Sequence, residues 1–160
     1  MRGLIWQYIA LSLIALITVS CGPGLDTETH PDFEKTQFEK ITREEIATLN
    51  AQGMLNSGII ANQTDIPVGQ IIVYKTRNGI FGKMQVTGYS GNAGFETLLA
   101  VSVNFKADGS EYSPVAFEVP STWVRDLESG QTIGGSGDFH WSNQPPLRLQ
   151  SLASALFRLY

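Results

Sequence analysis

Asp138 and His140 are the side chains whose types and spacing best suit general acid–base chemistry. On a strand they would share one face, with Phe139 and Trp141 on the other. A carboxylate beside an imidazole could orient a catalytic base or supply half of a metal site. The chain has two histidines and one cysteine, so a zinc site would need carboxylates from elsewhere. A strand with polar side chains facing outward and aromatic side chains facing inward is also typical of the edge of a sheet. We therefore expect no metal ion and no cofactor.

Two other groups of residues could in principle do chemistry. The stretch Gly134-Gly135-Ser136-Gly137 is neither a phosphate-binding loop ending in Gly-Lys-Ser/Thr nor a Gly-x-Ser-x-Gly elbow. Acid pairs such as Asp126 with Glu128, or Glu111 with Glu118, could serve glycoside cleavage if their carboxyls lay about 5 to 9.5 Å apart. We interpret the glycine-rich stretch as a flexible loop and the acid pairs as surface charge.

A row of aromatic and polar side chains is the feature that most favours binding. It lies along one face of a predicted hairpin formed by residues 70–77 and 80–89. Aromatic rings flanked by polar groups suit stacking on sugar rings or contact with a protein partner. The alternative is a second buried face, on which the same side chains only pack. The predicted binding surface comprises Tyr74, Phe81, Lys83 and Tyr89, extended by Trp123 or Trp141.

The registers of two hairpins follow from their turns. Asn78-Gly79 predicts a two-residue loop, which sets Val73 against Met84 on the core face and Tyr74 against Lys83 on the open face. The second hairpin turns at Gly109, and a three-residue loop there sets Leu99 against Phe117. A two-residue turn would pair Leu99 with Glu118 and move an apolar row to the wrong face. Pro114 is expected near an edge or a bulge.

The remaining elements are one short helix and further strands. Thr42 and Glu45 form a capping signal for a helix over about residues 43–52, which Gly53 ends. Five or six short strands with frequent turn signals predict a mainly β domain, either an antiparallel sandwich or a small open barrel. The segment 149–160 has helical spacing, yet it could equally close a sheet as a strand.

The beginning of the chain has the layout of a secretory signal. Arg2 precedes the apolar run Leu4 to Val19, and no acidic residue occurs before Asp26. The run has sixteen positions, which is short for a helix that must cross a bilayer core of about 30 Å. We therefore expect residues 1–20 to be a signal peptide rather than a permanent membrane span.

The end of that run, Ile17-Thr18-Val19-Ser20-Cys21, resembles the lipobox of bacterial lipoproteins. The resemblance implies that Cys21 becomes the mature N-terminus and carries acyl chains. Each buried methylene contributes about 0.8 kcal/mol, so two or more chains would anchor the protein stably to a membrane. Gly22, rather than Asp, after the cysteine goes with the outer membrane if the cell is Gram-negative.

The charge distribution separates a tether from a body. Residues 21–45 carry seven acidic and three basic side chains, and we expect 21–41 to be an acidic, lipidated tether. From Ile46 onward there are seven basic and eight acidic residues, so no surface for nucleic acid is expected. Residues 42–160 are predicted to form a single domain.

Two hairpins are followed by the segments Trp123 to Gly130 and Asp138 to Trp141. This order resembles that of small secreted bacterial β domains of unknown function. The resemblance covers roughly residues 66–160 and carries no catalytic residues over. We expect a lipid-anchored, non-enzymatic protein of the bacterial cell envelope that binds a protein partner or glycan through the hairpin face. The alternatives are a lipid-anchored hydrolase using Asp138, His140 and Ser136, and a purely structural envelope component.

Overall fold

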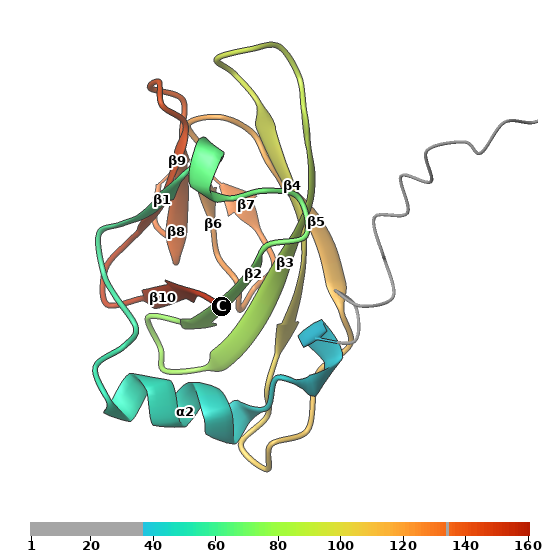
Figure 1. Cartoon of the computed structure of the whole chain (residues 1–160), viewed down its shortest axis with the longest axis vertical. Helices are drawn as coiled ribbons and strands as arrows, with labels where there is room; N and C mark the ends of the chain where they lie inside the picture. Colours follow the sequence, from blue (N-terminus) through green and yellow to red (C-terminus); the bar gives the residue numbers. More distant parts are fainter. Residues whose placement is uncertain (1–36, 134) are drawn as a thin grey trace, which may run out of the picture.

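The computed structural model describes residues 37–133 and 135–160, and in them two five-stranded antiparallel sheets pack against each other (Figure 1). The first sheet has the order β10-β2-β3-β4-β5 and the second β1-β9-β8-β6-β7. The strands are β1 (Ile59–Asn62), β2 (Ile71–Lys75), β3 (Phe81–Ser90), β4 (Thr97–Asn104), β5 (Val115–Val119), β6 (Val124–Arg125), β7 (Thr132–Ile133), β8 (Phe139–Ser142), β9 (Arg148–Ser151) and β10 (Leu156–Leu159). Neither sheet closes on itself, so the predicted mainly β, sandwich-like fold with a short N-terminal helix is confirmed.

The predicted signal peptide, Cys21 and most of the predicted tether lie outside the described residues. Phe38 and Ile41, at the end of the predicted tether, are buried against the domain. The folded body therefore begins before residue 42. No helix among residues 37–133 and 135–160 has the length and hydropathy needed to cross a membrane.

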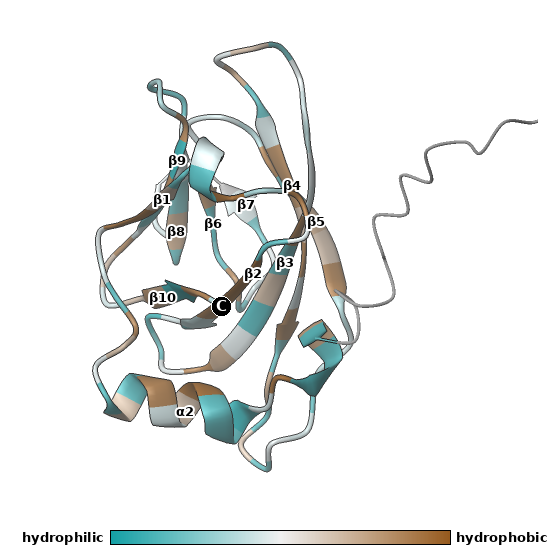
Figure 2. Ribbon diagram, in the orientation of Figure 1, coloured by the Kyte–Doolittle hydropathy of each residue, from teal (hydrophilic) through white to brown (hydrophobic). Residues whose placement is uncertain are grey.

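Helix α2 (Arg43–Ala51) forms where its capping residues predict it. The Thr42 hydroxyl accepts a hydrogen bond from the Glu45 backbone N–H at 3.2 Å, and Gly53 adopts a positive φ of 68° just after the helix. Hydrophobic and hydrophilic residues are interspersed along α2 in Figure 2. The apolar side, which includes Ile46 and Leu49, packs on the outer face of the first sheet.

The first sheet is consequently covered on both faces. The four residues Ile71 to Tyr74 of β2 are all buried, with Ile72 and Tyr74 facing the second sheet and Ile71 and Val73 facing α2. Between the sheets lies the larger core, where the Phe139 and Phe157 rings meet edge to face at 5.9 Å.

The predicted register of the first hairpin is wrong by one residue. Val73 pairs with Lys83 rather than with Met84. The loop has three residues, closed by a hydrogen bond from the Thr76 N–H to the Ile80 carbonyl at 2.8 Å, with Gly79 at a φ of 92°. Because side chains alternate along a strand, the slip turns Tyr74 into the core, whereas Lys83 stays on the outer face of the sheet, where residues 38–41 cover it.

The second hairpin has the predicted three-residue loop, with Gly109 at a φ of 87°. Its strands nevertheless pair Leu99 with Glu118, so the predicted partner Phe117 is wrong. Phe105 bridges Glu111 near the turn, whereas Ser102 pairs with Val115, so β5 gains one residue between these pairs.

Pro114 lies in this irregular segment before the edge strand β5, as predicted. The open question at the C-terminus is settled by β9 and β10, because residues 148–151 and 156–159 are strands and not a helix.

Candidate functional site

Tyr74 belongs to the core and not to an exposed binding surface. Its ring lies over Gly82 of β3, where an added Cβ would come within 2.4 Å of the ring. The Tyr74 hydroxyl donates to Asn104 Oδ1 at 2.7 Å, and burial raises the pKa of this hydroxyl. Glycine at position 82 therefore allows the tyrosine to reach across a strand to β4.

Lys83 is also fully buried, and its ammonium group is surrounded by partners. Nζ donates to the Ile41 carbonyl at 3.0 Å and pairs with Glu111 Oε1 at 2.5 Å. The rings of Phe38 and Phe105 lie 5.0 and 5.2 Å from it. Lys83 thus attaches the segment before α2 to the sheet, which is a structural role.

Trp141 is buried between the sheets. Its indole N–H donates to the Glu96 carbonyl at 2.7 Å, and its ring stacks on Tyr89 at 5.7 Å. The Tyr89 hydroxyl donates to the Ile66 carbonyl at 2.6 Å, and burial raises the pKa of Tyr89 to about 12. Both side chains therefore serve packing.

The other members of the predicted surface are Phe81 and Trp123. Phe81 is half-buried, with the Arg43 guanidinium 5.5 Å from its ring centre. Trp123 is 43% exposed. The prediction of a continuous exposed hairpin face is wrong, because the one-residue slip turns Tyr74 inward and the α2 segment covers Lys83.

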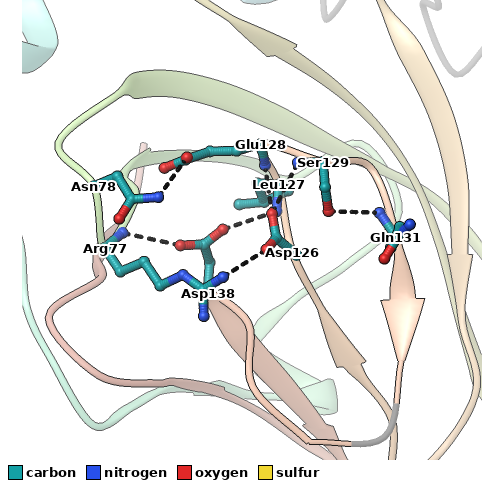
Figure 3. Close-up of polar contacts among 8 residues, drawn as sticks. All are labelled: Arg77, Asn78, Asp126, Leu127, Glu128, Ser129, Gln131 and Asp138. Atoms are coloured by element: carbon teal, nitrogen blue, oxygen red, sulfur yellow. Dashed lines mark hydrogen bonds and ion pairs between the residues drawn. The ribbon is translucent and has the colours of Figure 1, made fainter.

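The Asp138 carboxylate binds backbone groups and not the His140 side chain. The Asp138 carboxylate is buried and accepts hydrogen bonds from the backbone N–H groups of Arg77, at 2.9 Å, and Leu127, at 2.8 Å (Figure 3). Burial raises the pKa of Asp138. His140 lies in β8, which is interior to its sheet and not at an edge, opposite Val124 and Gln150. Asp138 therefore links the turn between β2 and β3 in the first sheet to the turn after β6 in the second sheet.

Among the described residues no group of three potential ligands could hold a metal ion.

A cavity of about 620 Å³ lies beside this junction. It is formed by the end of β4, the segment before β5, strand β6 and the turn after β6. Its lining is Ile80, Ser102, Asn104, Tyr112, Ser113, Val115, Arg125, Leu127, Glu128, Ser129 and Gly130. We call it the Arg125 cavity.

Arg125 is the unusual residue of this lining. It is only 5% exposed, and its guanidinium lies 4.3 Å from the centre of the Phe117 ring. Nη1 donates to Thr132 Oγ1 at 3.0 Å, whereas Nε is buried without a partner. Burial lowers the pKa of Arg125. In the described part of the chain no carboxylate forms an ion pair with Arg125.

The neighbouring carboxylates bind groups other than Arg125 (Figure 3). Asp126 pairs with Arg77 Nη2 at 2.7 Å and accepts from the backbone N–H groups of Glu128, at 3.0 Å, and Ser129, at 2.9 Å. Burial alone would raise the pKa of Asp126, but these hydrogen bonds and Arg77 lower it below its usual value. Glu128 Oε2 accepts from Asn78 Nδ2 at 2.6 Å, and its Oε1 is buried without a partner.

These contacts also explain how the cavity wall is held. Arg77 and Asn78 belong to the β2–β3 turn, and they bind Asp126 and Glu128 in the turn that follows β6. The two sheets therefore fix the position of the turn that carries Glu128, Ser129 and Gly130.

Sequence reasoning did not single out Arg125. The available signal was a single basic residue between the apolar residues Val124 and Leu127. Ser102 and Asn104 carried no comparable signal, because alternating polar residues are ordinary in strands.

A second cavity, of about 480 Å³, lies between β1 and β10. It is lined by Asn56, Ser57, Ile59, Ile60, Phe157, Arg158 and Leu159, and these include no buried charged residue. The Arg125 cavity is therefore the better candidate site. Comparisons with protein-family models, curated proteins and solved structures find no match to this chain.

Proposed function

We propose that this protein is a lipid-anchored, non-enzymatic component of the bacterial cell envelope that binds a ligand in the Arg125 cavity. The signal-like leader and the lipobox-like Cys21 support the anchor. The observation that supports binding is the buried Arg125 guanidinium, which lines the cavity and lacks a carboxylate partner among the described residues. Such a group is costly to bury alone, and an anionic ligand would compensate it.

The contacts of Asp138 also favour a binding role over a hydrolase activity. Both oxygens of this carboxylate accept backbone N–H groups, which orients them toward Arg77 and Leu127 and not toward His140. The Arg125 cavity offers a cation, hydroxyl groups and a tyrosine ring, and these recognise a ligand without requiring a reaction.

The anchor is tested by the intact mass of the membrane-extracted protein beside a Cys21→Ala variant. We expect a chain that begins at Cys21 and carries acyl groups, and an unmodified or uncleaved chain would contradict the anchor. An outer-membrane position in a Gram-negative cell would be tested by fractionation.

The binding site is tested with the full chain extracted in detergent and an array of envelope glycans and peptides. We expect captured ligands to be lost in Arg125→Met and retained in Arg148→Met, the matched change on β9. Equal capture by wild type and Arg125→Met would exclude this cavity as the site.

A further inference from the structure

The Arg125 cavity is lined by one buried cation, Arg125, and one carboxylate, Glu128, and these two form no ion pair within the described residues. Asp126 is paired with Arg77, and Asp138 is bound to two backbone N–H groups. Arg125 uses Nη1 for Thr132, and its Nε is buried away from solvent, so within the described residues Nη2 is the donor left for a ligand. A guanidinium N–H forms a charge-assisted hydrogen bond with a carboxylate oxygen.

The Glu128 carboxylate also lines the cavity. Its Oε2 is held by Asn78, and its Oε1 is buried away from solvent without a partner. The hydroxyls of Ser102, Ser113 and Ser129 line the same space and can both donate and accept.

The rim adds an aromatic ring and a second cation. Tyr112 lines the cavity with 52% of its surface exposed, and the Lys106 ammonium lies 5.4 Å from its ring centre. An exposed tyrosine ring offers an apolar face with a polar edge, which suits stacking on the C–H face of a sugar. A volume of about 620 Å³ lies within the usual range for small-ligand sites and accommodates one or two sugar rings.

We propose that the Arg125 cavity binds an acidic sugar, with the ligand carboxylate on Arg125, ligand hydroxyls on the serine side chains of the lining, and the sugar ring against Tyr112. This inference rests on the proposed binding function and names its ligand class. A sugar is favoured over a peptide carboxylate because the lining mixes apolar side chains with hydroxyl and amide groups, which matches the apolar C–H faces and polar hydroxyl edges of a sugar ring.

The test uses the detergent-extracted full chain and an array of matched probes. Carboxylated oligosaccharides are compared with their methyl esters, and short peptides with a free C-terminus are compared with their C-terminal amides. We expect at least one carboxylated oligosaccharide to bind at least tenfold more tightly than its ester. Binding should weaken with added salt, because a charge pair at a partly open site is screened.

Two variants locate the site. Arg125→Met should reduce binding of the acid to the level of the ester, while Arg148→Met leaves both unchanged. Ser113→Trp, at an exposed position of the lining, should block both probes by filling the cavity, and it supports the site even if Arg125→Met unfolds.

The other outcomes separate the inference from the proposed function. If the acid and the ester bind equally and Ser113→Trp blocks both, the proposal of an acidic ligand is overturned, and a binding function for the cavity is retained. Preference for the free C-terminal peptides would replace the sugar by a peptide. Absence of binding to every probe would overturn both proposals.

Discussion

Lys83, on β3 of the first sheet, and Arg125, on β6 of the second sheet, are two buried cations with contrasting environments. The Lys83 ammonium meets a carboxylate, a carbonyl oxygen and two aromatic rings, all supplied by the protein. The Arg125 guanidinium has one hydroxyl partner and one ring, and it lines a cavity. Burial alone therefore does not distinguish a structural charge from a binding one. The number of unused hydrogen-bond donors distinguishes them, since an unused donor is available to a ligand.

The largest effect is expected for Lys83→Ala, which breaks the structural side of this comparison. The change removes a fully buried ion-pair partner and leaves the Ile41 carbonyl without its donor. We expect the free energy of unfolding to fall by about 3 kcal/mol, measured by urea denaturation. Lys106→Ala, at an exposed position, is the control. A loss below about 1 kcal/mol for Lys83→Ala would show that its contacts are not stabilising.

Asp138→Asn is expected to have the next largest effect, about 2 kcal/mol, because one of two backbone N–H groups loses its acceptor. The pKa of Asp138 is raised above 3.8 in the folded protein, so its stabilisation is complete below that pH and is lost as the pH rises through the raised value. The difference in unfolding free energy between wild type and variant should therefore shrink from pH 4 toward pH 7. A difference that grows over this interval would mean that the ionised form is favoured.

Thr42→Ala tests the segment that supplies the Ile41 carbonyl to Lys83. Loss of the cap on the Glu45 N–H should lower the free energy of unfolding by about 1 kcal/mol. In Thr42→Ser the hydroxyl is kept, and stability should be close to wild type. If both variants lost the same amount, the hydroxyl would not be the cause.

The smallest effect on stability is expected for Arg125→Met, although Arg125 is almost as buried as Lys83. Removing a buried cation without an ion-pair partner should change the free energy of unfolding by less than about 1 kcal/mol in either direction. A loss as large as that of Lys83→Ala would make Arg125 a structural residue and remove the contrast between the two cations.

The sequence predicts the elements well where the signal is local. The Thr42 cap, the end of the helix before Gly53 and the Gly109 loop depend on a few adjacent residues, and all three form as expected. Asn78-Gly79 is compatible with more than one loop length, and the three-residue loop is the one that agrees with packing on both faces of β2.

The candidate site was less predictable for a related reason. Charged residues are rarely buried, so sequence reasoning places Lys83 at the surface and passes over Arg125. The burial of Lys83 depends on residues 38–41, which are far away in the sequence, and that of Arg125 depends on residues 117 and 132 of other strands. Such contacts have no signature in the local pattern.

The carboxylate of Asp138 has a consequence for the order of folding. It joins backbone groups that are 61 and 11 residues away along the chain, and one of them belongs to the opposite sheet. Neither hairpin can complete this junction alone, and closing a loop of that length has an entropic cost before any contact compensates it. We therefore expect the wall of the Arg125 cavity to be among the last parts of the molecule to form, so that a chain with only one sheet assembled would lack the candidate site.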